Sequence, residues 1–196
     1  MSAPDLRQRL QDALARSGGA SSDFDLNKDV TVPSTTLTPA AVLIGIRAET
    51  ETIILTKRSA RLKHHPGQIA FPGGKQDPTD PTLIDAALRE AHEEIGLPPA
   101  LVDVLGTLPP HQTVTGYQVT PVVAIIRGDY VPTPEAGEVS EIFEVPFSHL
   151  MMPEMYRVEG RRWQGRRRLY FTVPYGPYYI WGATARILRA FAERMS

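Results

Sequence analysis

Cysteine is absent from the 196-residue sequence. Its absence excludes disulfide bonds, thiolate metal sites and cysteine nucleophiles, and it agrees with a reducing compartment. An excess of either charge is also missing, because 21 basic and 22 acidic residues leave a net charge of −1. We therefore expect no nucleic-acid or membrane partner, since no net charge would attract one.

Long apolar runs are missing as well. No stretch approaches the roughly 20 apolar residues of a membrane-spanning helix, and the N-terminal MSAPDLRQRLQDALARSGG has no apolar signal core. We therefore predict a cytoplasmic protein. The length fits a single domain with a substantial core.

Apolar periodicity divides the remaining chain into few helices and several strands. This pattern predicts an α+β fold, with a mixed sheet flanked by helices. Residues 1–38 are expected to form a helix and a polar segment, either a wrapping arm or a linker, and residues 39–196 the main domain. The expected elements are helices at 4–16, 81–95 and 183–195, a hairpin of strands 40–47 and 51–58, strands at 101–108, 117–127 and 139–150, and a hairpin at 155–173 turning near Gly160 or residues 164–165.

The helix at 81–95 follows a loop rich in glycine and proline, FPGGKQDP. Asp80 is expected as its N-cap and Pro81 as its first residue, where a missing N–H has no consequence. At about 100° per residue, one stripe of this helix is apolar and predicts its core face, made of Ile84, Leu88, Ala91 and Ile95.

Three glutamates, Glu90, Glu93 and Glu94, share the other side of this helix at spacings of three and four. Arg89 is placed to pair with Glu93, but one arginine does not balance three carboxylates. Such a cluster is either a solvated acidic face or a site for hard divalent cations. Clustered carboxylate oxygens suit Mg²⁺ or Mn²⁺, which also bind phosphates.

Residues 89–97, REAHEEIGL, resemble the core of the Nudix box, Arg-Glu-apolar-x-Glu-Glu-x-Gly-apolar. The box usually starts with Gly, five residues, Glu and seven residues before the arginine. Here Gly74 and five residues lead to Asp80, and eight residues follow before Arg89. The acid is therefore different and the spacing is one residue longer, so the resemblance assigns Asp80 no role.

Residues 55–74, LTKRSARLKHHPGQIAFPGG, resemble the signature of the coenzyme A pyrophosphatases within the Nudix superfamily. TGYQVTPVVA, EVSEIFEVPFSHL and YYIWGATARIL are similar to later segments of that subfamily. The resemblance implies the Nudix fold, a mixed sheet between helices in an α/β/α sandwich. It also implies metal-dependent hydrolysis of the diphosphate of coenzyme A or its derivatives, giving adenosine 3′,5′-bisphosphate and 4′-phosphopantetheine or its acylated form.

The resemblance and the residue chemistry together give a set of candidate site residues. We expect Glu90 and Glu94 to be the main ligands of Mg²⁺ or Mn²⁺, with Glu93 completing the cluster and also acting in catalysis. Arg89 is expected to orient these carboxylates. The predicted substrate-binding residues are Arg58, Arg61, Phe71, Gly73 and Gly74, because guanidinium groups pair with phosphates and glycines let the backbone approach a ligand.

The general base stays open between a box glutamate and a carboxylate of the EAGEVSE segment. We place Glu141 in the catalytic set and keep Glu138 as its alternative. His64 and His65 are expected in loop packing or in solvent. The aromatic residues Tyr178, Tyr179 and Trp181 belong either to the core or to a pocket for adenine or pantetheine.

Residues 156–170 hold six arginines against one acid. They predict either a site for the 3′-phosphate of coenzyme A or, more commonly for such a run, a solvated basic hairpin. Two other functions compete with coenzyme A hydrolysis: Nudix hydrolysis of ADP-ribose or NADH, and a Nudix-fold binding domain without catalysis. Retention of all three glutamates disfavours the last. A small-molecule substrate is the expected partner, and a homodimer stays open.

Overall fold

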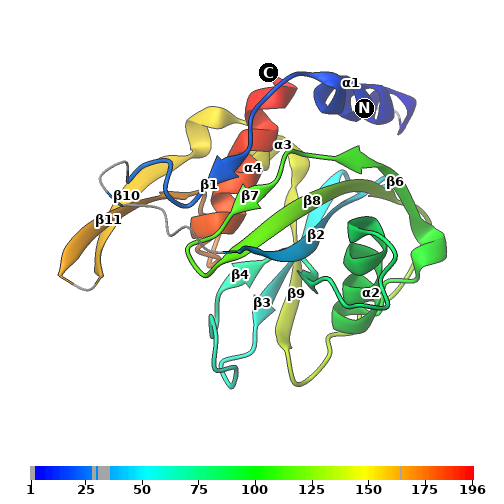
Figure 1. Cartoon of the computed structure of the whole chain (residues 1–196). Helices are drawn as coiled ribbons and strands as arrows, with labels where there is room; N and C mark the ends of the chain where they lie inside the picture. Colours follow the sequence, from blue (N-terminus) through cyan, green and yellow to red (C-terminus); the bar gives the residue numbers. More distant parts are fainter. Residues whose placement is uncertain (1–2, 28–29, 31–35, 164) are drawn as a thin grey trace.

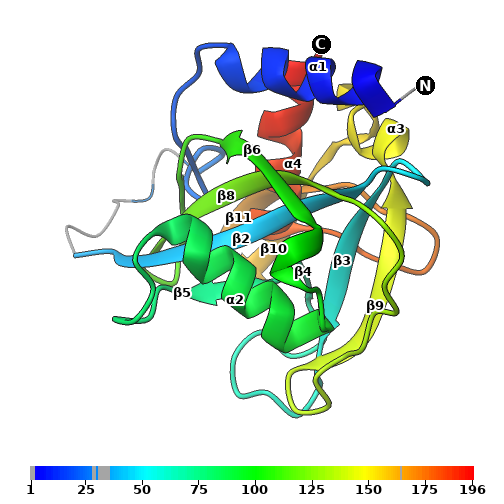
Figure 2. The same cartoon turned by 90° about the vertical axis from the view of Figure 1, so that its right-hand side faces the viewer.

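Helices cover both faces of a mixed β-sheet (Figure 1). The computed structural model describes residues 3–27, 30, 36–163 and 165–196. Helix α2 (Leu83–Ile95) lies on one face, while α1 (Ala3–Ala15) and α4 (Gly182–Met195) lie on the other (Figure 2). This arrangement confirms the expected α+β class and the sandwich of a mixed sheet between helices.

Strand β2 (Thr38–Arg47) lies at the centre of the sheet and pairs in parallel with β8 (Tyr117–Ile126) along its whole length. Its side chains alternate between two apolar cores. Leu43 contributes to the core beneath α2, whereas Ile44 and Ile46 contribute to the larger core beneath α1 and α4. A strand buried on both faces requires a nearly continuous apolar run, which AAVLIGI supplies.

The hairpin predicted at residues 40–47 and 51–58 forms, but its strands separate soon after the turn. β2 and β3 (Thr52–Arg58) pair only at Ile46↔Ile53 and Arg47↔Thr52. Beyond this point β5 (Gly73–Lys75) lies along β2, and β4 (Ile69–Ala70) and β9 (Val139–Pro146) flank β3. The glycine- and proline-rich segment therefore fills a fork in the sheet beside α2.

The first turn of α2 differs from the prediction. Its N-cap is Thr82, not Asp80, and Thr82 and Asp85 form a reciprocal capping box. The core face is also rotated from the predicted stripe. Ala87, Ala91 and Ile95 are buried, Ile84 and Leu88 lie at the edge of the core, and Glu94 is buried instead.

Another difference from the expected elements lies after the middle of the chain. Strand β9 stops at Pro146, and the short helix α3 (Phe147–Leu150) follows where residues 139–150 were expected to be one strand. The remaining elements are β6 (Val102–Thr107), β7 (His111–Gln112) and the one-turn helices η1 (Pro99–Leu101) and η2 (Pro153–Met155).

Strands β10 (Arg157–Trp163) and β11 (Arg166–Thr172) form a separate two-stranded antiparallel sheet. Their ladder continues to the pair Trp163↔Arg166, so a turn at Gly160 is wrong; Gly160 pairs with Leu169. The alternative turn at residues 164–165 includes Gln164, which lies outside the described residues. In Figure 1 this hairpin extends from the body on the side away from α2.

The predicted N-terminal helix packs onto the main fold, where Leu6 and Leu10 are fully buried in the core shared with α4. The described part of the following polar segment wraps the molecule. β1 (Ser21–Ser22) pairs in parallel with β7, and the side-chain amide of Asn27 exchanges two hydrogen bonds with the backbone of Leu169, at 2.8 and 2.9 Å. Residues 28–29 and 31–35 of this segment lie outside the described residues. The division at residue 38 stays a prediction.

A search of the helices among the described residues finds none with the length and apolar character that crossing a membrane requires.

Candidate active site

The two glycines of β5 bring the backbone unusually close to its neighbours. Gly73 has a φ of 153°, and a Cβ built on it would lie 2.4 Å from the carbonyl oxygen of Ala41. A Cβ on Gly74 would lie 2.6 Å from the carboxyl group of Glu90. The obstacle at Gly73 is backbone, so glycine is required there for β5 to pair with β2, whereas a side chain at Gly74 would displace the carboxyl group of Glu90.

Glu94 points into the fork of the sheet and is only 5% exposed. The backbone N–H of Gly73 donates to its Oε2 at 3.1 Å, and Arg58 Nη1 lies 3.9 Å from its Oε1. Burial raises the pKa of Glu94 from its ordinary 4.5 to about 7, and the charges of Glu90 and Glu138 add to this effect. The hydrogen bond from Gly73 and the charge of Arg58 therefore do not compensate for the loss of water around this carboxylate.

Glu90 and Glu93 both pair with Nη1 of Arg89, but they differ in exposure. Glu90 is half-buried beneath Gly74, with its Oε1 3.0 Å from Arg89 Nη1, and burial raises its pKa. Glu93 has a side chain that is 56% exposed, and it forms the predicted pair with Arg89 at 2.9 Å. The three carboxylates thus differ in exposure, from the buried Glu94 to the exposed Glu93, and their role as one metal-binding cluster stays a prediction.

Arg89 connects the helix to the preceding loop. Its Nε and Nη2 donate to the two carboxylate oxygens of buried Asp80, both at 2.9 Å, and Nη2 also donates to the carbonyl of Lys75 at 3.2 Å. Hydrogen bonds from Arg89 hold the pKa of Asp80 below its ordinary value. The structure therefore gives Asp80 a role that the sequence did not: it anchors the arginine that contacts Glu90 and Glu93.

The two carboxylates considered as general base lie in different surroundings. The charge of Glu138 helps to raise the pKa of both Glu90 and Glu94, so Glu138 lies within the field of this cluster. Glu141 instead accepts a hydrogen bond from the hydroxyl of Tyr178. It alternates along β9 with Ile142, which packs in the α2 core, so Glu141 belongs to the opposite face of the sheet.

The predicted substrate-binding residues fall into two groups. Arg58 lies at the glutamate cluster, and its Nε is buried without a hydrogen-bond partner among the described residues. Phe71 is buried in the core beneath α4 and supports the loop from below. Arg61 is exposed on the β3–β4 loop, as are His64 and His65.

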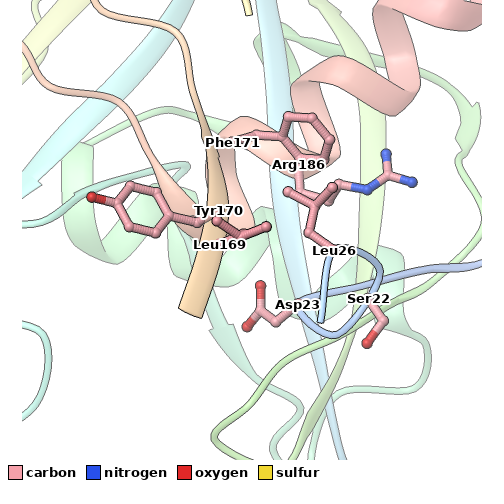
Figure 3. A pocket seen from close by; sticks show the side chains of 8 residues that line it. Ser22, Asp23, Leu26, Leu169, Tyr170, Phe171 and Arg186 are labelled. Atoms are coloured by element: carbon pink, nitrogen blue, oxygen red, sulfur yellow. The ribbon is translucent and has the colours of Figure 1, made fainter. Parts of the chain in front are cut away.

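The aromatic residues near the C-terminus gather away from the glutamates. Tyr178 stacks on Phe143 with ring centroids 3.6 Å apart, Trp181 contacts Tyr170 edge-on, and Tyr179 is exposed. A small hollow nearby lies between the N-terminal arm, β11 and α4 (Figure 3). Arg186 on its wall pairs with Asp25 at 2.8 Å. None of the residues that line this hollow belongs to α2, so the hollow is separate from the glutamate cluster.

The oxygen ligands near α2 fit a divalent cation in their chemistry. Among the described residues, no three His, Asp or Glu side chains are already arranged around one point. Even so, Glu90 and Glu94 are carboxylates withdrawn from water, with a third negative charge from Glu138 nearby and few cations to balance them. Clustered hard oxygen donors whose charge is only partly balanced suit Mg²⁺ or Mn²⁺.

The model of the NUDIX domain family matches residues 36–169. The chain belongs to the Nudix family. The uncharacterized Nudix hydrolase NudL of Enterobacter sp. strain 638 is 46% identical over 154 residues, which cover 78% of this chain and 80% of that protein. The NudL of Pectobacterium atrosepticum is 45% identical over 159 residues, covering 80% and 82%.

Solved Nudix structures share this fold at low sequence identity. The MutT protein of Methanosarcina mazei aligns with a TM-score of 0.53 at 19% identity, covering 84% of this chain and 96% of that one. The NUDIX domain of Shewanella oneidensis NrtR, solved with ADP ribose, aligns with a TM-score of 0.52 at 14% identity, covering 87% and 93%. The predicted Nudix fold is therefore confirmed, and Nudix hydrolases in general use divalent metals.

Proposed function

We propose that this Nudix hydrolase cleaves the diphosphate of coenzyme A and its derivatives, with Mg²⁺ or Mn²⁺ as cofactor. One observation carries the proposal. The segment that resembles coenzyme A pyrophosphatases, residues 55–74, forms the wall of the glutamate cluster. Its Arg58 approaches Glu94, its Gly73 donates to Glu94, and its Gly74 leaves room for Glu90. The segment with the resemblance therefore lies beside the glutamates that are predicted to bind the metal, which supports the proposal.

Each residue has a stated part in this proposal. Glu90 and Glu94, with Glu93 at the exposed end of the cluster, would hold the metal. A bound divalent ion neutralises diphosphate charge and lowers the pKa of water. Arg89, anchored on Asp80, orients Glu90 and Glu93. Arg58 is proposed to pair with a diphosphate oxygen, since its guanidinium lies beside Glu94 and its side chain is partly exposed.

In the reaction, the oxygen of water bonds to one phosphorus as the bridging P–O bond breaks, and a carboxylate accepts the proton of the water. Glu138 is favoured for that step because it lies in the field of Glu90 and Glu94. Glu141, the other predicted base, stays a prediction. A greater loss of turnover in Glu141→Gln than in Glu138→Gln would assign the proton to Glu141 instead.

The substrate is tested with a panel of coenzyme A, dephospho-coenzyme A, ADP-ribose and NADH, each with Mg²⁺ or Mn²⁺. We expect coenzyme A to give the highest kcat/KM, with adenosine 3′,5′-bisphosphate and 4′-phosphopantetheine identified by mass. A higher kcat/KM for ADP-ribose or NADH would transfer the proposal to the competing Nudix activity. Absence of turnover with all four would favour the binding domain. A homodimer and a cytoplasmic location remain predictions.

A further inference from the structure

The loop between β8 and β9 is fastened to the C-terminal end of α2. Beyond the left-handed cap at Gly96, the carbonyls of Glu94 and Ile95 accept hydrogen bonds from loop backbone N–H groups. Glu135 donates to Glu94 at 2.9 Å and Thr133 donates to Ile95 at 3.0 Å. The last carbonyls of a helix have no partner within it, so the loop satisfies them and is held beside the glutamate cluster.

The side chain of Glu135 then shapes the turn that carries Glu138. Its Oε2 accepts hydrogen bonds from the backbone N–H groups of Gly137, at 2.8 Å, and Glu138, at 2.7 Å. Its carbonyl accepts from Val139 at 2.8 Å, where β9 begins. One residue thus bonds to α2 through its N–H and closes the turn through its carboxylate and carbonyl.

The other side of this turn is attached to the end of β3. The carbonyl of Glu138 accepts from the N–H of Ser59 at 2.7 Å, next to Arg58. The hydroxyl of Ser140 donates to the carbonyl of Lys57 at 3.0 Å. The turn that contains Glu138 is therefore bonded both to the helix that carries Glu90 and Glu94 and to the end of the strand that carries Arg58.

We propose that Glu135 is a positioning residue of the metal site, because its carboxylate fixes the turn that presents Glu138 to Glu90 and Glu94. The proposal rests on the proposed function in one respect, the binding of a divalent cation by these glutamates. It does not depend on which diphosphate is the substrate. Glu135 acts by accepting hydrogen bonds from two backbone N–H groups. The positioning effect therefore needs its acceptor oxygen and does not need its negative charge.

Binding of Mn²⁺ tests this directly, since electron paramagnetic resonance counts free and bound Mn²⁺ without any substrate. Glu135→Ala removes the acceptor, and we expect about a tenfold weaker Mn²⁺ affinity, the size typical of residues that support a ligand. Glu135→Gln keeps an acceptor oxygen and loses the charge, so it should bind Mn²⁺ like the starting protein. Asp129→Ala removes an exposed charge from the same loop and is the matched control, with no expected change.

A double-variant cycle decides whether the effect passes through Glu138. In a Glu138→Gln background, Glu135→Ala should cause no further loss of affinity, because the carboxylate it positions is already gone. Equal losses in both backgrounds, or a loss in Glu135→Gln as large as in Glu135→Ala, would overturn the proposal. Glu135→Leu, of similar length and without an acceptor, replaces the alanine variant if that variant does not fold.

Failure of this proposal and failure of the proposed function give different results. A protein that binds Mn²⁺ but hydrolyses none of the four substrates contradicts the proposed function and leaves the cycle measurable. A protein that hydrolyses coenzyme A but shows no effect of Glu135→Ala contradicts only the positioning role. A starting protein that binds no Mn²⁺ would remove the metal site and this inference with it.

Discussion

Two regions of this protein concentrate charge of one sign, and the fold treats them differently. Around α2, nearly every acid has a partner: Asp80 and Glu93 bind Arg89, Glu94 accepts from Gly73, and Glu135 accepts from its own turn. On the β10–β11 hairpin, Arg161 lies opposite Arg168 and Arg162 opposite Arg167. Among the described residues none of these four arginines forms an ion pair. The acidic cluster is built into the fold, whereas the basic one faces solvent.

The comparison shows that a run of like charges in a sequence can form either a structured cluster or an exposed surface. Carboxylates held by backbone donors and by the half-buried Arg89 keep their places despite repulsion, and a bound cation would relieve that repulsion. Exposed arginines in water repel each other weakly, because solvent and salt screen them. A large effect of substitution is therefore expected near α2 and a small one on the hairpin.

The largest effect is expected from Glu94→Gln. Glu94 is the most buried of the three box glutamates, so no neighbouring side chain or water replaces it as a ligand. We expect a loss of turnover on the order of 10²–10³-fold, measured at saturating coenzyme A and Mg²⁺. Glu93→Gln is the matched control, because its side chain is 56% exposed and bonded to Arg89, and its loss should be much smaller. Equal losses of turnover in the two variants would show that the burial of a glutamate does not determine how much it contributes to activity.

The same substitution should stabilise the metal-free protein at alkaline pH. The folded pKa of Glu94 is about 7, above its ordinary 4.5, so its contribution to stability is present below pH 4.5 and is lost as pH rises through 7. Glutamine does not ionise. Glu94→Gln should therefore unfold like the starting protein near pH 5, and at pH 8 with EDTA should gain up to about 3 kcal/mol.

Urea denaturation at the two pH values measures this difference, and Mg²⁺ supplies the control. Adding Mg²⁺ at pH 8 should stabilise the starting protein, because the ion compensates the buried charge, and should stabilise Glu94→Gln less. A variant that is less stable than the starting protein at both pH values would show that the hydrogen bond from Gly73 outweighs the burial of charge.

The smallest effect is expected on the hairpin. Arg168→Glu places an acid opposite Arg161 and turns a repulsive cross-strand pair into an attractive one. We expect the free energy of unfolding to rise by about 0.5–1 kcal/mol. Arg157→Glu, opposite Thr172, relieves no such pair and serves as the control. The ratio of kcat/KM for coenzyme A to that for dephospho-coenzyme A should not change in either variant. A lowered ratio would show that the hairpin reads the 3′-phosphate, in spite of its distance from α2 in Figure 1.

The helices and most strands could be predicted because each reflects a local pattern. The 3.6-residue period of α2 and the apolar run of β2 are properties of consecutive residues. The fork between β2 and β3 could not be predicted, because it depends on the pairing of β5 with β2, about 30 residues away in sequence. The N-cap prediction was wrong for a local reason, because Thr82 and Asp85 form a capping box two residues after Asp80.

The sequence predicts which residue types take part in the candidate site, because residue type determines their chemistry. It does not predict their burial or their contacts, because these depend on position in the fold. The composition and spacing of REAHEEIGL predict metal ligands, and these stay a prediction. Nothing in the sequence shows that Glu94 is buried while Glu93 is exposed, because both lie outside the predicted apolar stripe. The ion pair of Arg89 with Asp80 crosses from the helix into the preceding loop, and the turn closed by Glu135 lies in a loop without an apolar pattern, so neither could be predicted.

The arm at residues 20–27 bears on where an independently folding fragment of this protein can begin. The family match starts at residue 36, after the arm. Yet His111 is 0% exposed, and its two ring nitrogens pair with Ser21 and Asp23, at 2.9 and 3.1 Å. A fragment cut at residue 36 would leave that imidazole and the backbone of Leu169 without their partners. The unit defined by sequence similarity is therefore smaller than the unit defined by physical chemistry.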